Sequence, residues 1–173
     1  MSEIVYRNEL FRIEESTVTM KDRSFKSHKI IEKDTVVILP ITKSGYILLE
    51  EQYRPGMADR VYEVPSGHID DGEDPLAAAG RELEEETGFK AGKITFATAF
   101  YSNPGMISKK ESLYIAEDLR PGTAHFDEDE DIIVRERSVE ECMDMVASNK
   151  IIDAKTIIAL LYYMHMFGPG GAE

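Results

Sequence analysis

The sequence is short of basic residues. It has 20 lysines and arginines against 33 aspartates and glutamates, which gives a formal net charge of −13 at pH 7. Proteins that bind nucleic acid set lysine and arginine against the phosphates. The charge balance therefore argues against a nucleic-acid partner. It fits local cation sites, or simply a soluble surface.

The sequence also lacks cysteine pairs and long apolar runs. Its single cysteine, Cys142, cannot form a disulfide within the chain, and the helical pattern around it predicts a packed thiol rather than a nucleophile. The first residues, MSEIVYRNELF, lack the basic and apolar regions of a signal peptide. No stretch approaches the ~18 apolar residues of a membrane span. We therefore expect a cytoplasmic protein without a membrane partner.

What the sequence contains is a mixed α+β pattern. Residues 1–34 alternate polar and apolar side chains, which predicts short strands in a small N-terminal antiparallel β-sheet extension. Residues 35–167 alternate between strands such as TVVILPI and YILLEEQYR and helical segments, and two helices close the chain. Asp153 is the expected N-cap of the second. Residues 168–173, GPGGAE, are expected to form a flexible tail.

The N-terminal extension supplies little apolar core of its own. Isolated hairpins are marginally stable in water, so a partner surface would stabilise these strands. We therefore predict that residues 1–34 mediate a homodimer.

A helix is predicted directly after the glycine-bearing turn GHIDDGED. Asp74 is a suitable N-cap, and Pro75 follows at the first helical position, where its missing N–H is not needed. Gly88 is a suitable left-handed stop. Leu76, Ala79 and Leu83 should form the buried face of this helix.

The other side of this helix is strongly acidic, with the sequence RELEEETG. Glu82, Glu85 and Glu86 can meet on one patch, where like charges repel. A hard divalent cation with oxygen ligands would make that arrangement favourable. Arg81, four residues before Glu85, can orient it. The alternative is a solvated acidic face with one i,i+4 charge pair.

The surroundings of the acidic helix favour the metal site, because together they resemble the signature of the Nudix hydrolases. That signature specifies nine positions at fixed spacing, and all nine match here: Gly67, Glu73, Arg81, Glu82, Leu83, Glu85, Glu86, Gly88 and Phe89. The resemblance implies an α/β/α sandwich. It also implies Mg²⁺-dependent attack of water on a diphosphate, with Mn²⁺ as a substitute.

Flanking segments resemble one branch of that family, the ADP-ribose pyrophosphatases and related nucleoside-diphosphate-sugar hydrolases. The segments are EEQYRPG, YEVPSGHID and YSNPG, and the resemblance covers roughly residues 35–165. It implies that the substrate is ADP-ribose or a similar nucleotide sugar, cleaved to a nucleoside monophosphate and a sugar phosphate. The alternatives are another sugar nucleotide, such as GDP-mannose, or a ligand sensor without turnover.

The resemblance also implies roles for individual residues. Glu82, Glu85 and Glu86 would hold metal together with the Ser66 carbonyl, and Arg81 would orient them. Glu130 would be a further ligand, and Glu128 the general base that activates water. Arg54 would hold a phosphate, and Pro104 and Gly105 would line the substrate site.

The acidic segment DEDED has other interpretations. A calcium loop counted from Asp127 would need glycine at its sixth position and glutamate at its twelfth, but Ile132 and Ser138 stand there. A solvated charge run stays open. The chain also departs from the branch at Lys109, where an acid is expected, and near Ser27 and His28. These departures concern the sugar and the base rather than the diphosphate chemistry.

Overall fold

The computed structural model describes residues 2–126 and 131–168. Its central strand, β4 (Thr35–Pro40), is buried along its whole length. Val36 and Ile38 face one apolar core, whereas Val37 and Leu39 face another. Because successive side chains point to opposite faces, a strand buried this way must be covered on both sides.

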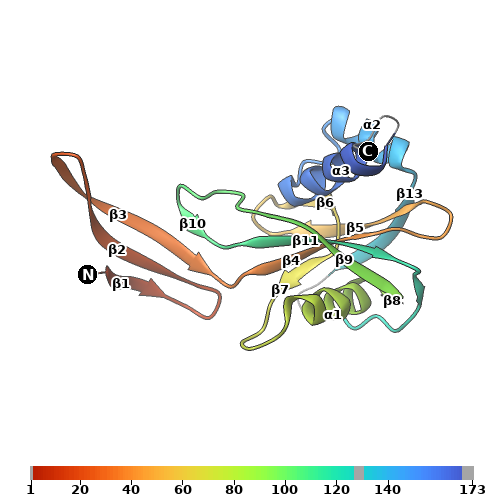
Figure 1. Ribbon diagram of the computed structural model, residues 1–173, viewed down its shortest axis with the longest axis horizontal. Helices are drawn as coiled ribbons and strands as arrows, with labels where there is room; N and C mark the ends of the chain where they lie inside the picture. Colours follow the sequence, from red (N-terminus) through yellow and green to blue (C-terminus); the bar gives the residue numbers. More distant parts are fainter. Residues whose placement is uncertain (1, 127–130, 169–173) are drawn as a thin grey trace.

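Two sheets make up the body of the molecule (Figure 1). The first has the order β7 (Ser66–His68), β4, β11 (Glu111–Glu117) and β9 (Lys93–Phe100), with β11 parallel to β4. The second is antiparallel, with the order β13 (Ile132–Arg137), β5 (Ile47–Arg54) and β6 (Asp59–Glu63). Two short strands, β8 (Phe89–Lys90) and β12 (Arg120–Pro121), pair beside them.

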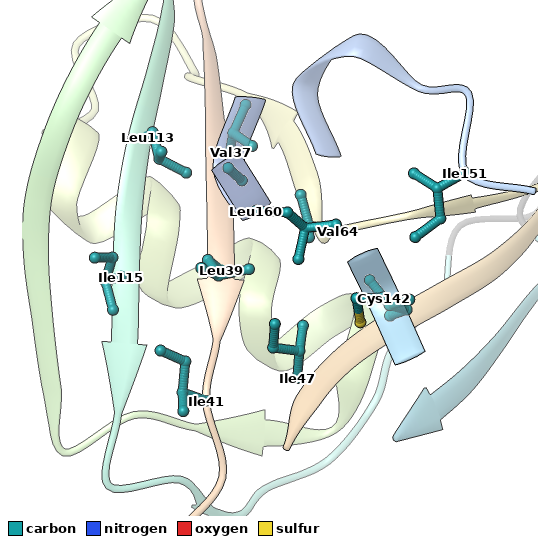
Figure 2. Close-up of a cluster of buried hydrophobic side chains, with 12 residues drawn as sticks. Val37, Leu39, Ile41, Ile47, Val64, Leu113, Ile115, Cys142, Ile151 and Leu160 are labelled. Atoms are coloured by element: carbon teal, nitrogen blue, oxygen red, sulfur yellow. The ribbon is translucent and has the colours of Figure 1, made fainter. Parts of the chain in front are cut away.

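Helices cover the two cores from opposite sides. Helix α1 (Pro75–Thr87) packs Ala78, Ala79 and Leu83 against Val36 and Ile38. Helices α2 (Val139–Ala147) and α3 (Ala154–Phe167) close the other core, which also takes side chains from β5 (Figure 2). The predicted α/β/α sandwich is therefore confirmed.

The buried face of α1 differs from the expected one at one end. Ala79 and Leu83 are fully buried, but Leu76 remains 47% exposed. By its spacing, Leu76 lies on the same side of the helix as Ala79 and Leu83, but it stands in the first turn, before the buried residues begin.

In the other core, the Cys142 thiol is fully buried, and burial raises its pKa to about 11. The expectation of a packed thiol is confirmed.

The N-terminal strands form a separate sheet that projects from the body (Figure 1). It contains β1 (Ser2–Arg7), β2 (Phe11–Met20), β3 (Arg23–Glu32) and β10 (Ile107–Ser108). Strands β2 and β3 have ten residues each, longer than the short strands expected. Strand β10 lies between the body strands β9 and β11 in the sequence, but it pairs in parallel with β3 of the N-terminal sheet. The division into an extension (1–34) and a body (35–167) stays a prediction.

No helix in the described part of the chain is long and apolar enough to cross a membrane.

Candidate active site

Helix α1 begins and ends as its sequence predicts. The Asp74 carboxylate accepts hydrogen bonds from the backbone N–H groups of Leu76 (2.9 Å) and Ala77 (3.2 Å). Gly88 ends the helix with φ of 73°, a left-handed conformation that glycine adopts without strain. These two caps set where the helix begins and ends, and the packing of Ala79 and Leu83 in the core sets its rotation.

Glu86 links helix α1 to strand β7. It is only 3% exposed, and its Oε2 accepts a hydrogen bond of 2.8 Å from the Ser66 backbone N–H. The structure therefore brings together two of the predicted metal-binding residues.

Glu82 occupies the space beside Gly67 on the neighbouring strand. A Cβ atom at residue 67 would lie 2.0 Å from Cδ of Glu82 and 2.2 Å from both of its carboxylate oxygens. The glycine of the signature is therefore explained by a close approach of the strand backbone to a carboxylate. Only a residue without a side chain leaves room for Glu82 here.

Arg81 gathers the remaining carboxylates of the signature. Its Nε and Nη2 bind the two oxygens of Glu73 at 2.9 and 2.8 Å. Its Nη1 donates to Glu82 (2.7 Å) and to Glu85 (3.0 Å), and Nη2 also donates to the His68 carbonyl (3.0 Å). All five N–H donors of the guanidinium are thus used. The expected contact between Arg81 and Glu85 is present.

These hydrogen bonds shift the pKa values of Glu73 and Arg81. The Arg81 guanidinium, followed by a hydrogen bond from the Asp70 backbone N–H, lowers the pKa of Glu73 from its ordinary 4.5 to about 2. The same contacts, Glu73 foremost, raise the pKa of Arg81. Glu73, a signature residue without an assigned role in the sequence analysis, therefore anchors the arginine that orients two other carboxylates.

The oxygen-rich composition of the site fits a hard divalent cation. Four glutamates approach Arg81 or Ser66 from α1 and the loop before it, and Mg²⁺ prefers carboxylate and carbonyl oxygens. Within residues 2–126 and 131–168, however, no three acidic, histidine or cysteine side chains form a ready-made ligand set. Arg81 Nη1 donates to both Glu82 and Glu85, whereas Glu86 accepts from the Ser66 backbone N–H.

Arg54 is tied to a buried partner that the sequence analysis missed. Its Nε and Nη2 donate to the two oxygens of Glu63, both at 2.8 Å. The Glu63 side chain is 4% exposed and that of Arg54 is 39% exposed. Arg54 is expected to bind a phosphate through paired N–H donors, but here these donors bind the Glu63 carboxylate. Part of the Arg54 side chain remains exposed to solvent. Glu63 lies nine residues away on the adjacent strand, and a sequence pattern does not reveal this pairing.

Pro104 and Gly105 line a groove of about 350 Å³ between the N-terminal sheet and the loop after β9. Ser27 and His28 of β3 form its opposite side, and Tyr101, which is 53% exposed, contributes an aromatic ring. The carboxylates of α1 do not line this groove. The structure therefore places the two predicted substrate-binding residues against β3.

Glu128 and Glu130 lie outside the described residues. The chain on either side of them is well anchored. The His125 backbone N–H donates to the Glu85 carbonyl at 2.9 Å, and Asp131 forms an ion pair with Arg60 at 2.5 Å. The chain thus enters this acidic segment directly beside α1.

Lys109, the departure from the expected acid, forms an ion pair of 2.9 Å with Glu32 at the end of β3. It therefore fixes β10 to the N-terminal sheet. Its charge is thus partly offset within the protein.

Residues 32–159 match the NUDIX domain family. The chain belongs to the Nudix family. The predicted family is thereby confirmed, and the matched range spans the whole α/β/α body apart from the end of α3.

Relatives of this Nudix protein include enzymes that act on nucleotide sugars. It is 38% identical over 129 residues to the ADP-ribose pyrophosphatase of Bacillus subtilis (strain 168), covering 73% of this chain and 70% of that protein. It is 34% identical over 140 residues to the GDP-mannose pyrophosphatase of Salmonella arizonae, covering 76% and 72%. A crystal structure of an ADP compounds hydrolase matches with a TM-score of 0.81 and 27% identity, covering 94% of this chain and 89% of that one.

Proposed function

We propose that this protein hydrolyses the diphosphate bond of ADP-ribose or a related nucleoside diphosphate sugar, giving a nucleoside monophosphate and a sugar phosphate. The observation that carries the proposal is the cluster of signature glutamates around Arg81 and Ser66. The identity to the ADP-ribose pyrophosphatase of Bacillus subtilis supports the choice of substrate class.

In this proposal, Glu82, Glu85, Glu86 and the Ser66 carbonyl hold Mg²⁺, for which Mn²⁺ can substitute, and Glu130 supplies a further ligand. When bound, the ion offsets the diphosphate charge and acidifies a water molecule. Arg81 keeps Glu82 and Glu85 oriented through its hydrogen bonds. Glu128 is the general base and takes the proton of the attacking water.

Arg54 and the groove beside β3 provide the binding contacts. The solvent-facing edge of Arg54 offers a charge for a phosphate oxygen. Pro104 and Gly105 border the groove, and the exposed ring of Tyr101 is suited to stack against a base.

A second candidate is a different sugar nucleotide, such as GDP-mannose. The identity to the Salmonella arizonae GDP-mannose pyrophosphatase favours it as the first alternative. A sensor without turnover is less favoured, because every signature carboxylate is present in this chain.

The test is phosphate release from a panel of sugar nucleotides, measured with a coupled phosphatase in the presence and absence of Mg²⁺. We expect ADP-ribose to be among the best substrates and turnover to require the ion. Preference for GDP-mannose would support the alternative. Binding without any phosphate release would support the sensor and overturn the proposal.

We further propose a homodimer formed through the N-terminal sheet, in a cytoplasmic protein. The support is a set of half-exposed apolar side chains on strands that project from the body: Ile4 (48%), Val5 (50%), Tyr6 (50%) and Phe25 (48%). Light scattering should give twice the 19.5 kDa of one chain at micromolar concentration. A single 19.5 kDa species would exclude the dimer.

A further inference from the structure

The segment that links β6 to β7 is held from two sides. On one side, the buried Val64 backbone N–H donates to the Thr156 hydroxyl of α3 at 2.9 Å. On the other side, the Ser66 backbone N–H donates to Glu86 of α1 at 2.8 Å. This short segment therefore connects the first turn of α3 with the candidate active site, although the two helices lie on opposite faces of the sheet.

The same turn of α3 carries a lysine that the proposed function does not use. Lys155 Nζ lies 2.8 Å from Oδ1 of Asp153 and 3.4 Å from Oε2 of Glu63. Its side chain is 19% exposed. Asp153 is itself fixed, because its other oxygen accepts hydrogen bonds from the hydroxyl (2.7 Å) and the backbone N–H (2.9 Å) of Thr156.

Glu63 therefore lies between two cations, Lys155 from α3 and Arg54 from β5. Burial alone would lower the pKa of Lys155, but the charges of Asp153 and Glu63 outweigh it and raise that pKa. The pKa of Arg54 is raised mainly by the hydrogen bonds that it donates to Glu63, and the charge of Glu86 adds to the effect. The electrostatic field at Arg54 therefore comes both from Glu63 and Asp153 and from Glu86 of the acidic helix.

We infer that Lys155 is a positioning residue, which shares Glu63 with Arg54 and so keeps the Arg54 guanidinium available to the diphosphate of a substrate. The inference rests on the proposed function. With Lys155 present, the two cations and the two carboxylates of this group balance. Without it, Glu63 and Asp153 would face Arg54 alone, and a guanidinium already neutralised by buried carboxylates attracts a second anion less.

The experiment measures the dissociation constant for inorganic pyrophosphate in the presence of Mg²⁺ by calorimetry. Lys155→Met should weaken binding about tenfold, and Lys155→Arg should restore most of it. In an Arg54→Gln background, Lys155→Met should change the constant less than about twofold, because its effect passes through Arg54. The matched control is Lys150→Met, which removes an exposed lysine that lies five residues earlier.

A purely structural role for Lys155 would give a different pattern. It would lower the melting temperature and weaken binding equally in both backgrounds, and that result would overturn the inference. No binding of pyrophosphate by the wild type would overturn it as well. If Lys155→Met does not fold, Lys155→Gln, which retains a polar group for Asp153, carries the same expectation.

Steady-state kinetics separate this inference from the proposed function. For ADP-ribose, Lys155→Met should raise KM about tenfold with a smaller change in kcat, since binding rather than chemistry is affected. Failure of the wild type to hydrolyse any sugar nucleotide would reject the proposed function, whereas the pyrophosphate measurement would still decide the role of Lys155.

Discussion

Glu82 occupies the position that a side chain at Gly67 would need. A Cβ on residue 67 would approach Cδ of Glu82 to 2.0 Å, far inside van der Waals contact. The two residues stand fifteen positions apart, on β7 and α1, and both belong to the family signature. The close approach makes the strand backbone one wall of the site and the glutamate another.

The first prediction concerns this contact. In Gly67→Ala, the flexible end of Glu82 must move, while the backbone, which is not in the left-handed region, tolerates alanine. The free energy of unfolding should therefore change by no more than about 1 kcal/mol. Turnover should fall about a hundredfold if Glu82 is a metal ligand as proposed, because its displacement would misplace the reacting groups.

Gly56→Ala is the matched control for Gly67→Ala. A Cβ at residue 56 would meet no atom within 4 Å, so neither turnover nor stability should change appreciably. Urea unfolding and kcat measured for both variants decide the matter. Full activity in Gly67→Ala would mean that the position of Glu82 is not critical.

The second prediction concerns the buried carboxylate of Glu86. Glu86→Gln keeps the shape and an oxygen that can still accept from the Ser66 backbone N–H, so the fold should survive. Its lost charge should lower kcat at least about a hundredfold. Near-normal turnover at saturating Mg²⁺ would contradict the assignment.

Glu84→Gln provides the comparison within the same helix. Glu84 points away from the other carboxylates and accepts from the Thr123 backbone N–H at 3.3 Å, which glutamine can also do. It loses only a partly exposed ion pair with Lys90. Such pairs contribute at most about 1 kcal/mol, so kcat should stay within about threefold of the wild type.

The third prediction uses the titration of Glu73. Its pKa is lowered by Arg81 to about 2, so the folded state binds the Glu73 proton less readily than the unfolded chain does. The resulting stability is fully present above the ordinary pKa of 4.5 and is lost as the pH falls from there towards 2. In EDTA, the difference in melting temperature between wild type and Glu73→Gln should therefore shrink as the pH falls below 4.5. A difference that stays constant over this range would rule out the linkage.

The sequence predicted those parts of the structure that depend on neighbouring residues. Asp74, Pro75 and Gly88 bound α1, and Asp153 caps α3, because capping depends on side chains and dihedral angles within one turn. The signature spacing likewise placed the glutamates on one helix. The rotation of that helix was predicted in part: Ala79 and Leu83 are buried, whereas Leu76 is exposed.

The sequence did not predict pairings between distant segments. Lys155 reaches Glu63 across ninety-two positions, and β10 pairs in parallel with β3 across more than seventy. Such contacts follow from how the sheets and helices pack, and no local pattern encodes them. The same limit applies to Arg54: the family resemblance implied that it holds a phosphate, but not that a buried glutamate would occupy two of its donors.

The last prediction separates the roles of Glu128 and Glu130. The chain enters their segment beside α1, because the His125 backbone N–H is bound to the Glu85 carbonyl. If Glu128 is the general base, Glu128→Gln should lower kcat with little change in metal dependence, and should alter the acidic limb of the pH–rate profile. If Glu130 is a metal ligand, Glu130→Gln should instead raise the Mg²⁺ concentration that gives half the maximal rate.

Glu140→Gln, an exposed position on α2, serves as the control and should change neither quantity. Measurements of kcat against Mg²⁺ and pH for the three variants distinguish the roles. Retention of most of the wild-type kcat in Glu128→Gln would place the base elsewhere, and Glu85, whose side chain is 38% exposed beside Arg81, would become the leading candidate.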